Sequence, residues 1–158
     1  MDILESVLDE FKNLAAIPRA NGHEQAVSDF LKQYLTDAGF TVVQDAKNNI
    51  IADKPATKGH ENAPRTILQG HMDMVAVGAE GVDYDPLTDP IKLVRTEKYL
   101  TADGTSLGAD DGIGVAEGIY LMKHAKEHGP LRLIVTTDEE RGMTGAISLD
   151  AKFLKDAQ

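Results

Sequence analysis

Residues 131–140 read LRLIVTTDEE, in which an apolar strand pattern runs directly into three acidic residues. Leu131–Thr136 is the clearest strand of the chain, and Gly129-Pro130 ends the helical pattern before it. Three consecutive acids are unfavourable beside a buried strand unless a cation or a reaction compensates their charge. A solvated loop is the alternative, and it is favoured when this stretch is taken alone.

Two other stretches place ionisable residues where an apolar run ends. Residues 67–73 read ILQGHMD, and residues 107–112 read LGADDG. His71 and Asp73 face the same side if the first strand continues through them. Imidazole is a common ligand of zinc and similar cations, and a nearby carboxylate often accepts the other ring N–H. An exposed polar pair is the alternative, because such short motifs often arise by chance.

The acids of the second and third stretches allow further roles in a metal site. Asp110 and Asp111 precede a helix pattern, and capping that helix is a common role for either. A cap needs only one carboxylate, however, and a single Asp can bridge two cations through its two oxygens. Glu139 and Glu140 could divide the work, one binding a metal and the other taking a proton from a metal-bound water.

Helical and strand patterns alternate along the chain, which predicts an α/β fold with ligand sites at the carboxyl ends of strands. Apolar spacing predicts helices at 3–15, 27–38, 113–126 and 149–157. Asp2 is expected to cap the first helix, and Asn21 with Glu24 the second. Strands are predicted at 40–44, 49–52, 66–70, 91–95, 99–102 and 131–136. His124 and His128 are expected in the last turn of the third helix.

The composition indicates one globular domain, with 158 residues of which 42% are hydrophobic. A formal net charge of −10 argues against nucleic acid and anionic membranes as partners. The absence of Cys excludes disulfides and thiolate zinc sites. Neither a signal-peptide pattern nor a long apolar run is present, so a soluble cytoplasmic protein is expected.

Four segments, in order, resemble the aminoacylase/carboxypeptidase-type metallopeptidases with two zinc ions, and more closely the aminoacyl-histidine (Xaa-His) dipeptidases. These segments are IPR at 17–19, QGHMDMV at 69–75, DGTSLGADDGIG at 103–114 and DEERGMTGA at 138–146. The resemblance covers essentially all 158 residues.

The resemblance implies a role for each candidate site residue. His71 would bind one metal ion, Glu140 the other, and Asp110 would bridge the two. Glu139 would be the general base, and Asp73 would orient His71. A cis peptide bond between Asp110 and the next residue is also implied.

The resemblance further implies an incomplete three-layer di-zinc exopeptidase-like catalytic domain, an α/β fold with a central mixed sheet and flanking helices. Residues 1–158 would be the N-terminal portion of that domain. The lid and dimerisation domain and the C-terminal part, which carry another Asp ligand and a His ligand in family members, would be absent. Each metal would then keep two protein ligands, fewer than the three typical of catalytic zinc. Lys152–Gln158 offers only Asp156, so this stretch is expected to bind zinc weakly and to have little activity alone.

The function implied is hydrolysis of dipeptides of the Xaa-His type by a metal-bound water, in an enzyme whose full-length relatives form homodimers. Two divalent ions are expected, with Zn favoured and Co or Mn also compatible with His and carboxylate ligands. A related amidohydrolase, such as a tripeptidase, aminoacylase or deacylase, is the first alternative. A non-catalytic metal-binding fragment is the second.

Overall fold

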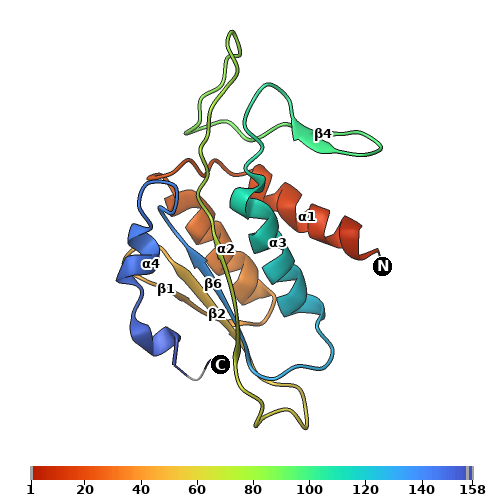
Figure 1. The fold of residues 1–158 in the computed structure, drawn as a ribbon, viewed down its shortest axis with the longest axis vertical. Helices are drawn as coiled ribbons and strands as arrows, with labels where there is room; N and C mark the ends of the chain where they lie inside the picture. Colours follow the sequence, from red (N-terminus) through yellow and green to blue (C-terminus); the bar gives the residue numbers. More distant parts are fainter. Residues whose placement is uncertain (1, 156, 158) are drawn as a thin grey trace.

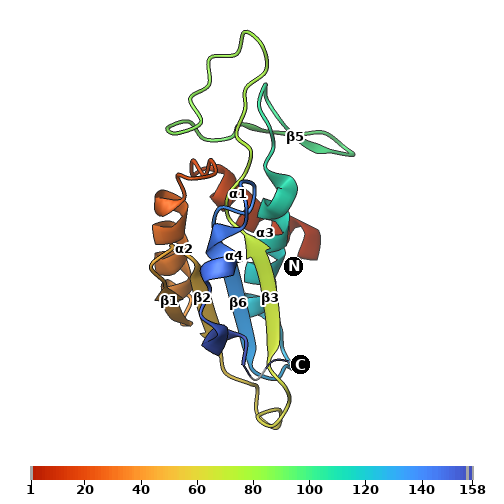
Figure 2. The same cartoon turned by 60° about the vertical axis from the view of Figure 1, so that its left-hand side comes forward.

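A four-stranded mixed sheet forms the centre of the fold in the computed structural model, which describes residues 2–155 and 157. Its strands follow the order β1-β2-β6-β3 (Figure 2). They are β1 (Thr41–Gln44), β2 (Ile50–Lys54), β6 (Leu131–Thr136) and β3 (Thr66–His71). β3 runs parallel to β6, whereas β1–β2 and β2–β6 are antiparallel. The predicted strands at 40–44, 49–52, 66–70 and 131–136 are therefore confirmed, with ends shifted by at most two residues.

Three helices cover one face of the sheet (Figure 1). α2 (Gln25–Asp37) packs on β1 and β2, α3 (Ala109–His124) packs on β3 and β6, and α1 (Ile3–Ala15) packs on α3. Alternate residues of β6, Leu131, Leu133 and Val135, point into the core between these layers. Burial of the apolar helix faces against the sheet stabilises this arrangement, by about 25 cal/mol per Å² of apolar surface removed from water.

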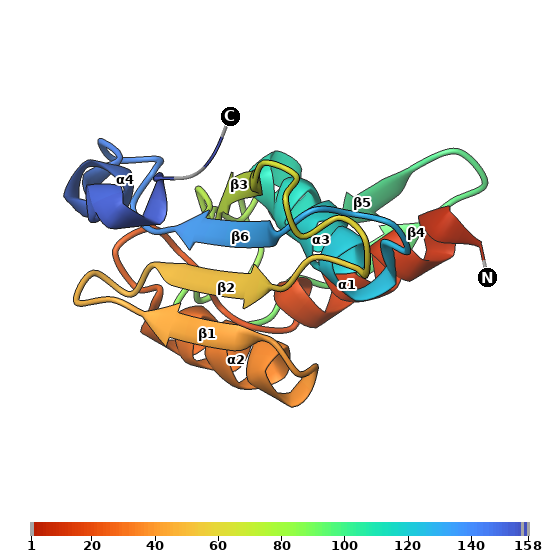
Figure 3. The same ribbon diagram turned by 90° about the horizontal axis from the view of Figure 1, so that it is seen from below.

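Among the described residues, the opposite face of the sheet carries only short elements. α4 (Thr144–Ser148) and a 3-10 turn, η1 (Ala151–Phe153), follow β6 on this side (Figure 3). A cavity between them and the sheet is lined by apolar side chains, such as Ile67 and Ile134, and by His71, Asp111 and Glu139. The expected mixed α/β fold with flanking helices is thus confirmed.

A hairpin stands apart from the main sheet. β4 (Leu93–Arg95) and β5 (Leu100–Ala102), both predicted as strands, pair antiparallel and lie alongside α1, with the 75–90 segment beside them (Figures 1 and 2). Arg95 of this hairpin forms an ion pair with Glu5 of α1. Asp2 caps α1 as expected, by accepting a hydrogen bond from Leu4 N at 3.0 Å.

Three local predictions are wrong. Glu24 precedes α2 but makes no capping bond, because its carboxylate accepts from Gly22 N and from a distant strand end instead. His128 lies beyond the end of α3, in the connection to β6. The helix predicted at 149–157 is replaced by η1, since Leu149 is extended and Asp150 caps the new turn through Lys152 N. Position 156 lies outside the described residues.

None of the helices in the described part of the chain combines the length and hydropathy that a membrane span requires.

Candidate metal centre

The first and third motifs meet because their strands are parallel neighbours. The last residue of β3, His71, is in register with the last residue of β6, Thr136. The residues that follow each strand therefore emerge at the same edge of the sheet. Met72 N donates to Thr136 O at 2.8 Å and continues this pairing one step further. The predicted convergence at the carboxyl ends of strands is confirmed for these two motifs.

The second motif reaches the same edge from the start of α3. Gly70 of β3 allows this approach, because a Cβ there would lie 2.6 Å from Asp111 Oδ2. The peptide bond between Asp110 and Asp111 is cis, as the resemblance implied. The regular helix begins only after this pair, because Asp110 and Asp111 have non-helical backbone angles. Burial raises the pKa of Asp111, and a backbone hydrogen bond from Gly114, three residues further on, lowers it, as expected of a carboxylate that caps this helix. The capping alternative therefore holds for Asp111.

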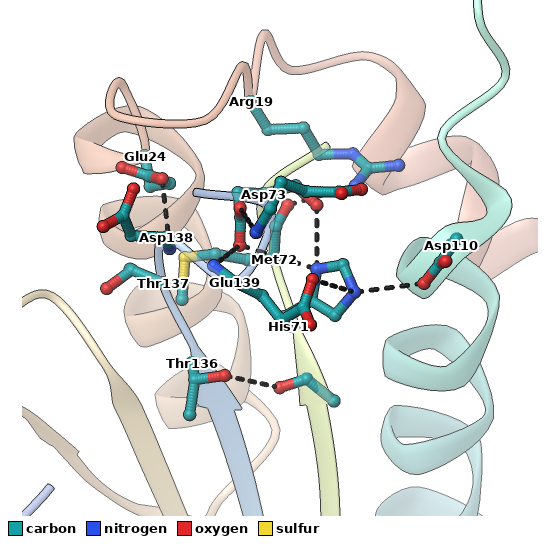
Figure 4. A network of polar contacts seen from close by, with 12 residues as sticks. Arg19, Glu24, His71, Met72, Asp73, Asp110, Thr136, Thr137, Asp138 and Glu139 are labelled. Carbon is teal, nitrogen blue, oxygen red and sulfur yellow. Dashed lines mark hydrogen bonds and ion pairs between the residues drawn. The ribbon is translucent and has the colours of Figure 1, made fainter. Parts of the chain in front are cut away.

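His71 stands at the centre of the three motifs (Figure 4). Its Nε2 lies 3.1 Å from Asp110 Oδ1 and 3.8 Å from Glu139 Oε2. Its Nδ1 lies 3.1 Å from the backbone oxygen of Asp73 and 3.5 Å from the carboxylate of the same residue. One ring nitrogen thus faces the buried support and the other faces the two acids. This orientation points Nε2 toward the carboxylates of Asp110 and Glu139.

The side chains around His71 differ sharply in exposure. The side chain of Asp73 is fully buried and that of His71 is 9% exposed, whereas that of Asp110 is 89% exposed and that of Glu139 is 41% exposed. Asp110 and Glu139 can therefore meet a ligand arriving from solvent. Asp73 can act only through the groups that it already touches.

Residues 137–140, called here the acid loop, are fixed by side chains from three distant segments. The four successive backbone N–H groups of this loop all donate to side-chain oxygens. Asn49 Oδ1 accepts from residue 137 at 3.1 Å, and Glu24 Oε1 accepts from residue 138 at 3.3 Å. Asp73 accepts from residues 139 and 140 at 3.1 Å each, one through each carboxylate oxygen. The acid loop is therefore fixed along its backbone, while the side chains of its two Glu residues project from it.

Sequence reasoning missed the supporting residues Asn49 and Glu24. Asn49 is fully buried, which is unusual for its residue type, and it also donates to Asp45 and to Gly145 O. The only sequence signal was a polar residue at the start of an apolar strand. Glu24 was interpreted as a helix cap, because nothing local indicates a partner more than 100 residues away.

The electrostatics favour a charged His71 when no cation is bound. Burial lowers the pKa of His71, but hydrogen bonds to Asp73 and Asp110 and the charge of Asp73 raise it, with a net value of about 9. Burial raises the pKa of Asp73, but His71 and the N–H groups of the acid loop outweigh burial and leave this pKa lowered. Burial also raises the pKa of Asp111. His71 is therefore held as a cation among carboxylates, which is where a metal cation would compete with its proton.

We expect the metal-free chain to lose stability between about pH 6.5 and pH 9. The pKa of His71 is about 9 in the folded chain against an ordinary value of 6.5. The contribution is fully present below the unfolded pKa and disappears as the pH rises through the folded pKa. It amounts to at most roughly 3.5 kcal/mol at about 1.4 kcal/mol per pKa unit. Urea unfolding in a chelator, compared with His71→Asn, measures it, and an equal pH slope in both chains would contradict it.

The side chains at this site are of the types that bind divalent cations, but among the described residues too few of them come together to hold one. An imidazole nitrogen and a carboxylate oxygen 3.1 Å apart are suitable ligands for zinc and related ions. Within residues 2–155 and 157, however, no group of three or more His, Asp or Glu side chains is arranged so that it could hold a metal ion. The carboxylate of Glu140 makes no hydrogen bond or ion pair with any described residue, and the structure does not bring it to His71.

The fold is similar to that of known peptidase domains. The structure matches the crystal structure of aminoacylhistidine dipeptidase from Vibrio alginolyticus with a TM-score of 0.91 and 37% identity, covering 99% of this chain and 33% of that one. Over 148 residues the chain is 36% identical to the cytosol non-specific dipeptidase of Escherichia coli K12, covering 93% of this chain and 30% of the relative. The chain is therefore homologous to part of two dipeptidases, which are hydrolases.

A more distant likeness concerns the fold alone. A Bacillus subtilis protein described as a dinuclear metal-binding peptidase of the M20 family matches with a TM-score of 0.62 at 18% identity, covering 99% of this chain and 41% of that one. No family model matches the chain. The chain spans about a third of the length of the two dipeptidases.

Proposed function

We propose that this chain contributes to a metal-dependent site that hydrolyses dipeptides. The observation that carries the proposal is the meeting of His71, Asp110 and Glu139 from three separate segments at one edge of the sheet. A buried carboxylate, that of Asp73, lies behind them and contacts both His71 and the acid loop. Homology to dipeptidases supports peptides as the substrate class.

The proposed ligands are His71 and Glu140, one for each of two divalent ions, with Asp110 between them. A divalent cation held there would polarise a peptide carbonyl and lower the pKa of a water molecule. The dinuclear site named for the Bacillus subtilis protein is consistent with two ions. The ligand types favour Zn, with Co or Mn as alternatives.

Glu139 is proposed to take the proton from the attacking water and to pass it to the leaving amine. Its backbone is fixed by Asp73, its side chain is half-exposed, and its Oε2 reaches to 3.8 Å from His71 Nε2. A general base must have such access to the reacting groups while remaining firmly placed. Asp73 is proposed to keep His71 oriented so that Nε2 faces the metal.

The remaining parts of the site are proposed to lie in regions that the relatives possess beyond the matched third. These regions would supply the additional ligands, a lid domain and a dimer interface. The preferred substrate is proposed to be an Xaa-His dipeptide, in line with the name of the Vibrio alginolyticus relative. A cytoplasmic location is proposed from the name of the Escherichia coli relative.

A hydrolysis assay with the chain at high concentration tests this function. With added Zn²⁺ or Co²⁺, we expect slow release of amino acids from Xaa-His dipeptides, abolished by a chelator. Dipeptides without His, tripeptides and N-acyl amino acids serve as comparison substrates. Faster hydrolysis of tripeptides or N-acyl amino acids would replace the dipeptidase assignment with another amidohydrolase. A chelator-resistant rate would contradict metal dependence.

A further inference from the structure

Arg19, in the connection between α1 and α2, is buried beneath the candidate metal centre. It is 2% exposed and lies next to the ends of two site segments (Figure 4). Its Nη1 donates to Met72 O at 3.0 Å, and its Nη2 donates to Gly108 O at 2.5 Å. Each of these carbonyls comes one or two residues away from a proposed functional acid, Asp73 or Asp110. A single guanidinium therefore links the end of β3 to the start of α3.

Two glycines, Gly108 and Gly112, lie against the guanidinium of Arg19 with no room for a side chain of their own. A Cβ at Gly108 would lie 2.5 Å from Nη2, and a Cβ at Gly112 would lie 2.6 Å from the same atom and 2.8 Å from Phe11. Two glycines thus allow the helix start to close over the planar group. Arg19 Nε has no hydrogen-bond partner among the described residues. Leaving a buried N–H unpaired is unfavourable, so the contacts on the other two nitrogens must outweigh it.

The backbone on either side of Arg19 reinforces the link to β3. Arg19 O accepts from Met74 N at 3.1 Å, and Asn21 N donates to Met74 O at 3.1 Å. Burial lowers the pKa of Arg19 to about 10, while the charges of Asp73, Tyr84 and Asp111 raise it, so the group remains a cation at neutral pH. A buried cation with acids on the site side is well placed to balance their charge.

We infer that Arg19 is a positioning residue, which holds the end of β3 and the start of α3 at the separation that lets His71 and Asp110 bind one cation together. This inference rests on the proposed function for its consequence, although the clamp itself is a feature of the metal-free fold. Arginine suits the role because its fork reaches two carbonyls at once, whereas lysine offers a point charge on a flexible stem.

The matched control is Arg132, a second buried arginine far from the site. Arg132 donates to Phe153 O at 2.7 Å and pairs with Asp53, so it also combines a backbone carbonyl with an acid. Arg132→Met should reduce stability without moving the site segments. Arg19→Lys keeps the charge and is expected to fold, and Arg19→Met removes both charge and fork.

The test combines Zn²⁺ affinity by calorimetry with backbone amide spectra of the metal-free chain. We expect the Zn²⁺ dissociation constant to rise at least tenfold in Arg19→Lys, and further in Arg19→Met, with less than a twofold change in Arg132→Met. In the metal-free spectra, Arg19→Lys should shift the amide signals of Asp73 and Asp110, whereas Arg132→Met should leave them in place. Unshifted signals in Arg19→Lys, or an affinity equal to that of the unsubstituted chain, would overturn the inference.

The two measurements, Zn²⁺ affinity and amide spectra, distinguish a failure of this inference from a failure of the proposed function. A chain that binds no Zn²⁺ but shows the Arg19-dependent shifts would refute the metal site and retain the clamp. A chain that binds Zn²⁺ and hydrolyses dipeptides equally well with Arg19→Lys would retain the function and refute the clamp.

Discussion

Replacing Asp73 with Ala is expected to weaken Zn²⁺ binding by about 10–100-fold and to lower the free energy of unfolding by roughly 2–5 kcal/mol. The first figure is typical for losing a group that orients a metal-binding His. The second follows because the fully buried Asp73 carboxylate accepts from Glu139 N and Glu140 N. Each buried N–H left without a partner costs about 1–3 kcal/mol, which gives about 2–6 kcal/mol for the pair, and the remaining structure can relax to recover part of it.

Calorimetry and chemical unfolding measure the two effects of Asp73→Ala separately. Asp73→Asn is the milder variant, since it keeps one acceptor oxygen and places an NH₂ group against an N–H of the acid loop. The matched control is Asp53→Ala, which breaks ion pairs with Arg65 and Arg132 on another part of the sheet. Asp53→Ala should affect stability alone. Equal Zn²⁺ affinities for Asp73→Ala and Asp53→Ala would show that Asp73 has no role in the site.

Replacing Glu139 with Gln is expected to remove metal-dependent dipeptide hydrolysis, by about 100–10,000-fold if the base contributes what such groups usually do. Gln keeps the shape of the side chain but cannot take a proton. Stability and Zn²⁺ affinity should change little, because the Glu139 side chain is 41% exposed and its nearest charged contact, His71, is 3.8 Å away.

Glu140→Gln is the control for this experiment, because the neighbouring residue is proposed to have the opposite role. Glu140→Gln should lower Zn²⁺ affinity, and its activity should recover partly at higher Zn²⁺ concentration. Excess metal should not restore Glu139→Gln. If the two variants behaved the other way round, the assignments of base and ligand would have to be exchanged.

The sheet and the helix layer could be predicted because their signals are local. β6 is buried along its whole length and appears in the sequence as a continuous apolar run, whereas α1 buries one face whose helical period is visible in the sequence. The meeting of the first and third motifs could also be predicted, because β3 and β6 both lead from apolar residues into ionisable ones. The prediction of a helix at 149–157 was wrong because the apolar spacing around Leu149 and Leu154 did not reveal the break at Asp150.

The supports of the site could not be predicted, because their partners are distant in the chain. Glu24 has the residue type and spacing of a helix cap, yet its carboxylate serves the acid loop 114 residues away. Asn49 and Arg19 act on backbone groups, which leave no trace in the sequence of the segment that they hold. Arg19 belongs to a short segment that resembles the family, and nothing in that segment indicates that Arg19 is buried.

The claim that His71 and Asp110 bind one cation together is tested most directly by the Zn²⁺ affinity of Asp110→Asn. The Asp110 side chain is 89% exposed, so its substitution should leave the fold intact. We predict a Zn²⁺ dissociation constant at least tenfold higher than that of the unsubstituted chain, by calorimetry near neutral pH. Glu117→Gln, at an exposed acid of the same helix, should leave it unchanged. Equal affinities for Asp110→Asn and the unsubstituted chain would contradict the account.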